Sequence, residues 1–412
     1  MTPTYIGVKT CRVCSSAALC PVIDLGSQPP ANSLRRHHRI HLPRIPLELI
    51  RCGTCAALQL SVSVDPTRLF RHYVWVTGTS TTARHYAESF CDEALHRLGY
   101  RPAMTVEIAS NDGTFLTPFL RRGLRVLGID PARNIALQAS RAGVPTRTSF
   151  FGLREAHRLL RANGAADLVI ARNVLPHVPD CHDVLAGIRT LLADNGIGVI
   201  EFHDARVVLQ ELHYDSIYHE HHLYLSLRTL AYLLQEQGLF AFDVMTSPIS
   251  GGSLVVFFSH SRRRPTAALA RELAKSRKSG VNTASRWRAF ARKALVHRER
   301  LRNIVTTHAA KGTVVGYGAS ARSSTLLNFC GINSSHVRCI ADQNPLKHQH
   351  YTPGTDIPIW PPERVFGLKP SAVLLLAWNF EREILGMIRD TFSFRGSVIV
   401  PLPGPSQVLE LG

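Results

Sequence analysis

Hydrophobic and polar positions follow a different pattern on either side of about Thr79. Beyond it, short apolar runs rich in β-branched residues take turns with segments in which apolar residues recur at helical spacing. Strands are predicted over 104–109, 125–130, 166–171 and 198–202, and helices over 114–122, 132–142 and 183–192. Because strands alternate with helices, this part of the chain predicts a doubly wound parallel sheet.

The loop after the first predicted strand is typical of a cofactor site. A tight turn follows the strand directly, an acidic residue closes the second strand, and Asn173 follows the strand at 166–171. This pattern predicts adenosylmethionine, since the loop passes close to its amino-acid part and the acidic residue accepts from its ribose hydroxyls. Ala109 stands where such motifs usually carry glycine. The predicted cofactor contacts are Glu107, Ala109, Ser110, Asn111, Asp112, Gly113, Asp130 and Asn173.

Four of the nine cysteines have the spacing of metal ligands. Cys11 and Cys14 form one Cys-x-x-Cys knuckle, and Cys52 and Cys55 form a second, so the four thiolates supply the tetrahedral set that zinc prefers. The segment between the knuckles is rich in proline and poor in regular structure, and a metal would hold it together. Four thiolates leave no open coordination position, which predicts a structural rather than a catalytic zinc.

Ionisable side chains crowd the segment 215–222, and His177 follows the strand at 166–171. Metal ligation is one reading, but His219, His221 and His222 lack the i, i+4 spacing of a helical zinc site. Histidines with a purely structural role are a second reading. Several titratable groups gathered in one segment are typical of acid–base catalysis, which is the reading we favour.

A second glycine-containing loop lies near the carboxyl end. Gly316-x-Gly318-x-x-Ala321 follows the apolar run 313–315, opens a predicted helix and precedes Asp342 by roughly 20 residues, as a dinucleotide fingerprint does. The spacing alone fits NAD. A diphosphate would rest on the helix amide groups there, with further donors from Arg322 and the serines beside it.

The net charge of +18 is concentrated in one segment. Residues 262–302 hold 14 Lys or Arg against two Glu, a local net charge of +12. Apolar residues at helical spacing predict one amphipathic helix with an arginine-rich face, either a solvated connector or a docking surface for phosphates. An RNA-binding or nucleic-acid-modifying protein that uses the cysteine knuckles and this basic segment therefore stays as the alternative function, although no recognised nucleic-acid module accompanies the charge.

The sequence predicts a cytoplasmic protein without a membrane span. The first residues lack the apolar run of a signal peptide, and no stretch approaches the ~20 apolar residues that a transmembrane helix needs. The oligomeric state is not indicated.

Taken together and in this order, the motifs resemble those of the sugar C-methyltransferases of deoxysugar biosynthesis. The resembling blocks are the two cysteine knuckles and 107–113, 173–178, 218–222, 251–253, 316–328, 342–347, 351–354 and 377–380. The resemblance implies an α/β protein with a small N-terminal zinc-binding domain, a central Rossmann-like class I methyltransferase domain and a C-terminal Rossmann-like domain. The expected bounds are 1–75 for the zinc-binding domain, 76–260 for the methyltransferase domain, 261–310 for a basic helical connector and 311–412 for the nucleotide-sugar-binding domain.

The resemblance also implies a reaction and its residues. The family methylates C-3 of nucleotide-activated 4-keto-6-deoxy sugars, of which the thymidine diphosphate form is expected here, by base-promoted enolisation. It implies His221 as the base, Glu220 and Tyr218 as polarising or positioning groups, and His177 and Tyr73 near the sugar. The implied nucleotide-sugar contacts are Gly316, Gly318, Ser320, Arg322, Ser323, Asp342, Lys347 and Asn379.

Overall fold

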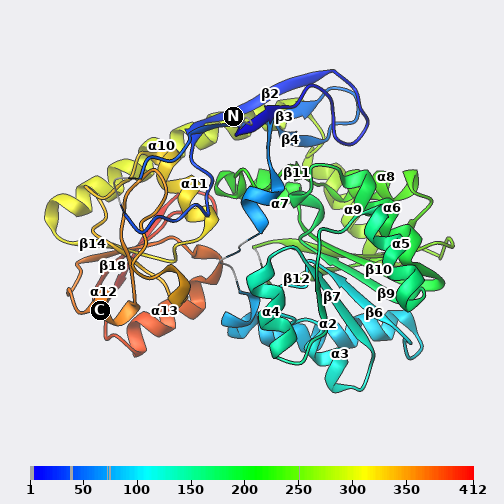
Figure 1. The fold of residues 1–412 in the computed structure, drawn as a ribbon. Coiled ribbons are helices and arrows are strands. Elements are labelled where there is room, and N and C mark those ends of the chain that lie inside the picture. Colours follow the sequence, from blue (N-terminus) through cyan, green and yellow to red (C-terminus); the bar gives the residue numbers. More distant parts are fainter. Residues whose placement is uncertain (1–3, 38–39, 72, 74–75, 250) are drawn as a thin grey trace.

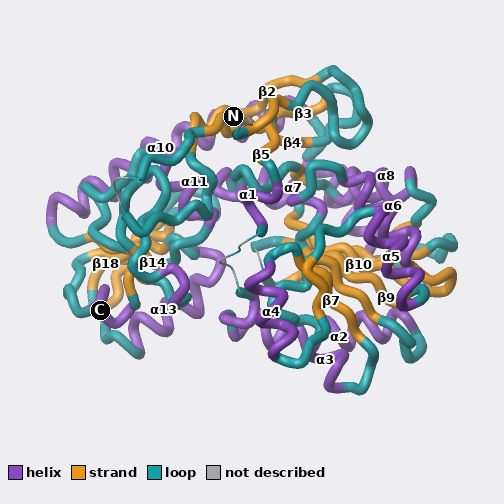
Figure 2. The backbone as a smooth tube through the Cα atoms, viewed as in Figure 1, coloured by secondary structure: helices purple, strands orange, loops and turns teal. Residues whose placement is uncertain are grey.

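The computed structural model describes residues 4–37, 40–71, 73, 76–249 and 251–412. Two lobes lie side by side, and the blue N-terminal strands extend across the top of both, beside α10 (Figure 1). The described strands form four sheets. Figure 2 shows the two larger ones, one in each lobe, and the N-terminal strands above them. This arrangement brings three parts of the chain to one boundary between the lobes.

The N-terminal sheet is antiparallel and takes one strand from the middle of the chain. Its order is β11-β4-β3-β2, and a separate pair joins β1 to β5. The strands are β1 (Tyr5–Gly7), β2 (Leu19–Gln28), β3 (Ile45–Cys52), β4 (Leu58–Leu60), β5 (Val62–Val64) and β11 (Leu223–Tyr224). Because β11 directly follows the segment 215–222, the N-terminal sheet and that segment are held together by strand hydrogen bonds.

The central sheet has seven strands in the order β12-β13-β10-β9-β6-β7-β8. The five from β10 to β8 are parallel, as predicted, while β12 and β13 add an antiparallel edge. The strands are β6 (Thr105–Ile108), β7 (Val126–Asp130), β8 (Thr146–Thr148), β9 (Ala166–Arg172), β10 (Leu192–His203), β12 (Phe240–Ser247) and β13 (Ser253–Ser259). The carboxyl ends of β6, β7 and β9 therefore meet at one edge, where ligands bind in such sheets.

The same part of the chain also carries helices and one-turn helices. They are α1 (Pro66–Phe70), η1 (Thr77–Thr79), α2 (Thr81–Leu98), α3 (Thr117–Arg121), α4 (Arg133–Arg141), α5 (Leu153–Asn163), η2 (Leu175–His177), α6 (Cys181–Leu191), α7 (Ala205–Glu211), η3 (Tyr214–Ser216) and α8 (Leu227–Glu236). The helix predicted from residue 114 begins at Thr117, because residues 110–116 are used by turns and Pro118 favours a helix start.

The C-terminal sheet has six strands in the order β16-β15-β14-β17-β18-β19, parallel except for β19. Its strands are β14 (Val314–Tyr317), β15 (Ile340–Ala341), β16 (Ile359–Trp360), β17 (Ala372–Leu375), β18 (Gly396–Val400) and β19 (Gln407–Leu411). Its helices are α11 (Ala321–Cys330), η4 (Pro345–Lys347), α12 (Pro362–Phe366), η5 (Trp378–Phe380) and α13 (Glu381–Asp390). This is the second Rossmann-like unit that the sequence predicts.

The basic segment is two helices, so the prediction of one amphipathic helix is wrong. α9 (Ala267–Ser279) ends at Gly280, whose left-handed φ of 70° terminates the helix, and α10 (Ala284–Lys311) starts after a short turn. α9 packs on α8 and β12, whereas α10 packs on α11, β14 and β2. α9 therefore belongs to the central lobe, whereas α10 lies mainly on the C-terminal lobe and also contacts α7, and most of their basic side chains are exposed.

In the part of the chain that the structure describes, no helix has the length and apolar character of a membrane span.

Candidate active site

One cavity of about 720 Å³ is lined by all three parts of the chain. Asn32 and Tyr73 come from the N-terminal part, the loops after β6, β7 and β9 come from the central sheet, and the start of α11 comes from the C-terminal sheet. A second, more open cavity of about 530 Å³ lies between α10 and β19 and shares none of these residues. The larger cavity is the candidate active site.

Most of the predicted site residues line this cavity. They are Tyr73, Glu107, Ala109, Ser110, Asn111, Asp130, Asn173, His177, Tyr218, His221, Gly318, Ser320, Arg322, Asp342, Lys347 and Asn379. Of the remaining predicted residues, all described, five support the wall from behind: Asp112, Gly113, Glu220, Gly316 and Ser323. The structure thus brings the predicted residues together, and their individual roles stay predictions.

The first loop is shaped by Asp130 at the end of β7. Its Oδ2 accepts the backbone N–H of Asn111 at 2.9 Å, and its Oδ1 accepts that of Ala132 at 2.8 Å. Ala109 and Asn111 have left-handed φ angles of 54° and 51°, so the chain turns sharply although glycine is absent from both positions. Burial raises the pKa of Asp130 to about 6. A group bound here meets a carboxylate whose position is already fixed.

Gly113 and Asp112 hold the far side of the same loop. Gly113 has a φ of 80°, and a Cβ there would lie 2.9 Å from Val144, so only glycine fits. Asp112 accepts the backbone N–H of Gly78 at 3.0 Å and bonds the hydroxyl of Thr114 at 2.7 Å. Both residues, which were predicted to contact the cofactor, stabilise the conformation of the loop.

Beneath the loop lies a buried charge cluster that the sequence analysis missed. Arg172 Nε donates to Glu201 Oε2 at 2.7 Å, and the same guanidinium lies over the ring of Phe115. Glu107 is 3.9 Å from Arg172, and burial raises its pKa to about 8. One arginine therefore faces two buried acids, and Glu107 is the acid that lines the cavity.

Tyr218 and His221 form a hydrogen-bonded pair on the cavity wall. His221 Nδ1 lies 2.9 Å from the backbone oxygen of Ser216, and Tyr218 Oη lies 2.7 Å from His221 Nε2. Because a carbonyl oxygen only accepts, Nδ1 carries the proton and Nε2 accepts from the phenol. Burial lowers the pKa of His221 well below its usual range, with a smaller effect from His177. The imidazole is therefore neutral and has its lone pair directed at Tyr218.

Glu220 lies behind the cavity wall and anchors residues from the N-terminal part. Asn32 Nδ2 donates to its Oε1 at 2.6 Å, and Tyr73 Oη donates to its Oε2 at 3.2 Å. Burial raises the pKa of Glu220 to about 7, against the lowering effect of these two hydrogen bonds. Asn32 was missed because its proximity to Glu220, 188 residues away, arises only from the docking of the N-terminal part.

His177 completes this group of side chains. Its ring centroid is 4.6 Å from that of His221, and the edge of Phe70 packs on it at 5.6 Å. Within the described residues, His177 Nδ1 has no hydrogen-bond partner, and burial lowers the pKa of this histidine to about 4. A neutral imidazole with an unused nitrogen thus lies beside His221.

Hydrogen bonds within the second loop fix the carboxylate of Asp342, the acidic residue of the dinucleotide fingerprint. Asp342 Oδ2 accepts from the backbone N–H of Ala319 at 2.8 Å and from Lys347 Nζ at 3.0 Å, while Oδ1 accepts from the backbone N–H of Asn344 at 2.9 Å. Both oxygens are therefore engaged in shaping the loop. Ser320 and Ser323 form a reciprocal capping box at the start of α11.

Gly316 and Gly318 are required by close packing in this loop. A Cβ on Gly316 would lie 2.8 Å from Ile340, and one on Gly318, whose φ is 95°, would lie 2.4 Å from Ala377. Both glycines therefore let β14 and its loop approach the neighbouring strands.

Arg322 has a protein partner besides any ligand. Its Nε and Nη2 each donate to the carboxylate of Asp215 at 3.0 Å, and Trp378 Nε1 donates to the same carboxylate at 2.8 Å. Asp215 is 1% exposed, so this is a buried bidentate ion pair. The predicted contact of Arg322 with a diphosphate stays a prediction, because the guanidinium also lines the cavity.

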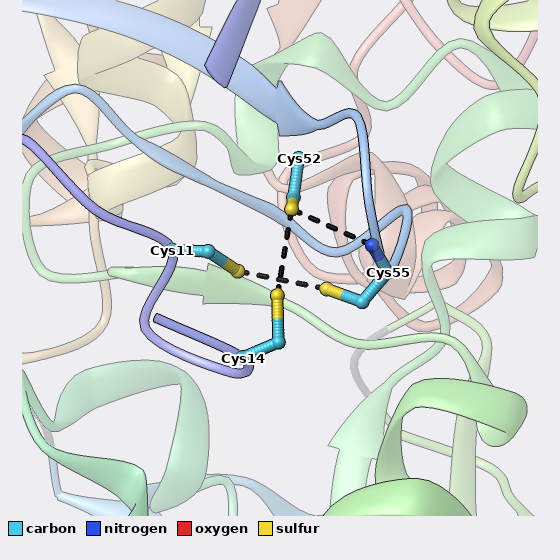
Figure 3. Close-up of side chains that lie close together, drawn as sticks. All are labelled: Cys11, Cys14, Cys52 and Cys55. Carbon is cyan, nitrogen blue, oxygen red and sulfur yellow. Dashed lines mark hydrogen bonds between the residues drawn. The ribbon is translucent and has the colours of Figure 1, made fainter. Parts of the chain in front are cut away.

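The four predicted metal ligands converge outside this cavity (Figure 3). The sulfur atoms of Cys11, Cys14, Cys52 and Cys55 all lie within 4.8 Å of one another, and two of the pairs are 3.6 Å apart. A tetrahedral zinc with Zn–S bonds of about 2.3 Å needs sulfur atoms about 3.8 Å apart. The cluster fits zinc, because four cysteine sulfur atoms at this separation can surround one ion.

The first cysteine knuckle also contacts the loop that carries His177. Arg12, inside the knuckle, donates from Nη1 to the backbone oxygen of Pro179 at 2.9 Å and from Nη2 to Ser63 Oγ at 2.6 Å. His182 Nε2 lies 3.0 Å from the backbone oxygen of Val13. The metal cluster is therefore continuous with the wall of the candidate active site.

Three family models cover most of the chain. Residues 11–70 match a zinc binding domain, 83–241 a methyltransferase domain and 248–403 the C-terminal domain of C-methyltransferases. A curated relative, the C-methyltransferase NovU of Streptomyces niveus, is 34% identical over 406 residues, which cover 97% of this chain and 96% of the relative. These matches confirm the predicted fold class and both predicted cofactors, adenosylmethionine and zinc.

Solved methyltransferases resemble part of the chain. Magnesium protoporphyrin IX methyltransferase (ChlM) from Synechocystis PCC 6803 with bound SAM is 15% identical, with 48% of this chain and 99% of that chain covered and a TM-score of 0.36. The CcbJ methyltransferase from Streptomyces caelestis is 12% identical, with 48% and 100% covered and a TM-score of 0.37.

Proposed function

The chain belongs to the C-methyltransferase family, and from this premise we propose that it methylates C-3 of a nucleotide-activated 4-keto-6-deoxy sugar. The methyl donor is adenosylmethionine, which supplies a sulfonium methyl group. The observation that carries the proposal is one cavity lined by three features: the loop predicted to bind adenosylmethionine, the second loop of dinucleotide-binding type, and a neutral histidine paired to a phenol. Two ligands can therefore meet at one proton-transferring pair.

The cofactor end of the cavity suits a cationic donor with a ribose. Asp130 is held by two backbone N–H groups and keeps lone pairs for ribose hydroxyls. Burial raises the pKa of Glu107 to about 8. The positive charge of a bound ammonium would favour the charged form of this carboxylate. Both features support the assignment of this end to adenosylmethionine.

The opposite end suits the nucleotide diphosphate. The first turn of α11 presents backbone N–H groups at the end of a helix, where phosphates are stabilised. Lys347 is 5% exposed and uses two of its three N–H groups on Ala319 O and Asp342, which leaves one for a phosphate oxygen. The engagement of Asp342 in the loop favours a nucleotide sugar over NAD here.

The chemistry follows from the substrate and the histidine pair. A ketone at C-4 acidifies the proton on C-3, and His221 Nε2 takes this proton when the Tyr218 phenol turns away from it. The C–H electron pair forms the C-3=C-4 enolate, and the released phenol donates to the enolate oxygen. C-3 then attacks the methyl carbon, the S–CH3 bond breaks and its electrons remain on sulfur as a neutral thioether.

A panel of nucleotide sugars tests this proposal. Each acceptor is incubated with enzyme and methyl donor, mass spectrometry looks for the mass of one added CH2, and NMR assigns the methylated carbon. We expect product from 4-keto-6-deoxy sugars, with the thymidine diphosphate form tested first, and none from the matching 4-hydroxy sugars. Methylation of a 4-hydroxy sugar, or of a carbon other than C-3, would contradict the proposed reaction.

A further inference from the structure

A turn between the two lobes contacts the catalytic pair from behind. The one-turn helix η3 (Tyr214–Ser216) and the next residue, Ile217, lie between the end of α7 and Tyr218. The backbone oxygen of Ser216 accepts the Nδ1 proton of His221 at 2.9 Å. This contact decides which nitrogen of His221 keeps a lone pair toward Tyr218. The position of this turn therefore determines which ring nitrogen of His221 carries the proton.

The C-terminal lobe holds this turn through buried contacts. Arg322 binds the carboxylate of Asp215 with two hydrogen bonds of 3.0 Å, and Trp378 Nε1 adds a third of 2.8 Å. Thr325 Oγ1 donates to the backbone oxygen of Ile217 at 3.0 Å. The residues immediately before and after Ser216 are thus both fixed from the C-terminal sheet's side.

These contacts support one another. The Arg322 guanidinium carbon lies 4.4 Å above the ring of Trp378, and the ring of His213 packs on the same indole at 4.6 Å. Asp215 and Thr325 are each 1% exposed, so water competes little for their hydrogen bonds. A charge-assisted bidentate pair in such surroundings defines one geometry rather than several.

We propose that Asp215, Trp378 and Thr325 are positioning residues for His221, through which the C-terminal lobe orients the imidazole of the central lobe. The inference rests on the proposed function in that it takes His221 as the base. Its consequence is that the lobe assigned to the nucleotide sugar contributes to proton removal as well as to binding. The effect acts through the Ser216 carbonyl, and these three side chains lie outside the residues that line the cavity.

Trp378→Phe is the sharpest variant, because it removes one N–H donor and keeps an aromatic ring for Arg322 and His213. We expect kcat to fall about 10- to 100-fold, the scale of a slightly misplaced catalytic group, while KM for both substrates stays within about threefold. Asp215→Asn and Thr325→Val should act in the same direction. Thr325→Val keeps the ion pair intact, so it serves if either of the other two variants fails to fold.

A double-mutant comparison tests the route through His221. In a His221→Asn background, Trp378→Phe should cause no further loss of rate, because the residue that it positions is already gone. Additive losses would overturn the proposal. So would a raised KM with unchanged kcat, since that result belongs to a role in binding.

Thr82→Val is the matched control, since Thr82 Oγ1 donates to Glu383 Oε2 at 3.0 Å and so also joins the two lobes, but far from η3 in the chain. We expect this variant to keep the wild-type kcat. An equal fall in kcat would show that any loosening of the lobes is enough, and would overturn the assignment to η3.

A measurement without substrate separates this inference from the reaction itself. Long-range 1H–15N spectra of ring-labelled histidine distinguish Nδ1–H from Nε2–H in the resting enzyme. We expect a single Nδ1–H form for His221 in the wild type and a mixture of forms in Trp378→Phe. Unchanged spectra in all three variants would overturn the inference even if the enzyme methylates the expected sugar. A shift to the mixture would support it whichever acceptor proves to be the substrate.

Discussion

The phenol of Tyr218 donates a 2.7 Å hydrogen bond to Nε2 of His221, the nitrogen that would accept a proton in the proposed enolisation. If His221 is the base, as proposed, the enzyme without substrate blocks it with a hydrogen-bond donor. In the proposed reaction the donor would be needed elsewhere once substrate binds, because negative charge would develop on the C-4 oxygen. Transfer of the phenol from histidine to substrate would free the base and stabilise the enolate in one movement.

The first prediction concerns the two members of this pair. His221→Asn should keep both ligand affinities and lower the rate of methyl transfer by about 100- to 10,000-fold, the usual cost of a lost general base. Single-turnover assays measure the rate, and exchange of the C-3 proton in D2O without methyl donor isolates the enolisation step. If His221→Asn methylates near the wild-type rate, the base is one of Glu220, Tyr218 and His177.

Tyr218→Phe should separate the two roles of the phenol. It unblocks His221 but removes the donor to the enolate, so we expect a loss of about 100- to 1,000-fold, the cost of one lost oxyanion donor. Proton exchange should slow together with methyl transfer, since both require the enolate. Normal exchange with slow methylation would assign Tyr218 to the placement of the methyl group instead.

The second prediction concerns pH. Burial raises the pKa of Glu220 to about 7, and only its ionised form accepts from both Asn32 and Tyr73. The rate should therefore rise with pH, with a midpoint near 7. The hydrogen bond from Asn32 lowers this pKa, so Asn32→Ala should move the midpoint to higher pH. pH–rate profiles of the wild type and of Asn32→Ala measure the two midpoints.

Glu220→Gln is the control for that shift, because an amide does not titrate. The acid limb near pH 7 should disappear in this variant. Burial lowers the pKa of His177 to about 4 and that of His221 well below its usual value, so neither histidine should titrate near 7. A limb that survives in Glu220→Gln therefore belongs to another group.

The third prediction concerns cofactor binding. Asp130→Ala removes a carboxylate that shapes the loop through two backbone N–H groups and would accept from ribose hydroxyls. Adenosylmethionine binding should weaken by about 1 to 3 kcal/mol, the scale of lost hydrogen bonds to a charged group. Calorimetry measures this directly, and Asp130→Asn, which retains one acceptor, should lose less. Unchanged affinity in Asp130→Ala would place the ribose elsewhere.

The fourth prediction concerns the metal. Elemental analysis should find one zinc per chain, and Cys52→Ser should lower both zinc content and melting temperature, because metal binding contributes directly to folding. Arg12→Ala should keep the zinc but lower kcat by up to about 100-fold, since the Pro179 carbonyl near His177 loses its partner. Arg12→Lys, which keeps one donor, should recover part of the rate. Full activity in Arg12→Ala would show that the first cysteine knuckle contributes to stability and not to the reaction rate.

The sequence predicted what depends on local spacing. The cysteine knuckles, the strand period and the glycine positions at Gly316 and Gly318 are set within a few residues, and each is found where predicted. The break at Gly280 could also have been read locally, because glycine after a basic last turn is a common helix end. The prediction of one helix rested instead on the helical spacing of apolar residues in the segment.

Contacts between distant segments could not be predicted from spacing. Asp215 and Arg322 are 107 residues apart, and Asn32 and Glu220 are 188 apart, so each pair exists only after separate sheets have docked. Arg322 shows the limit most clearly. Its position in a phosphate-type loop predicts a ligand contact, whereas the structure reveals a buried acid that no local pattern connects with it.

β11 joins the zinc-binding part of the chain to the candidate catalytic segment 215–222. This two-residue strand follows Tyr218 and His221 by a few positions, yet it is hydrogen bonded to β4 in the N-terminal sheet. A chimera that exchanges only the first 75 residues with a relative would pair a foreign β4 with the native β11 and a foreign Asn32 with the native Glu220. Exchange of substrate preference within the family should therefore succeed only when the N-terminal part and residues 204–224 move together, as one discontinuous cassette.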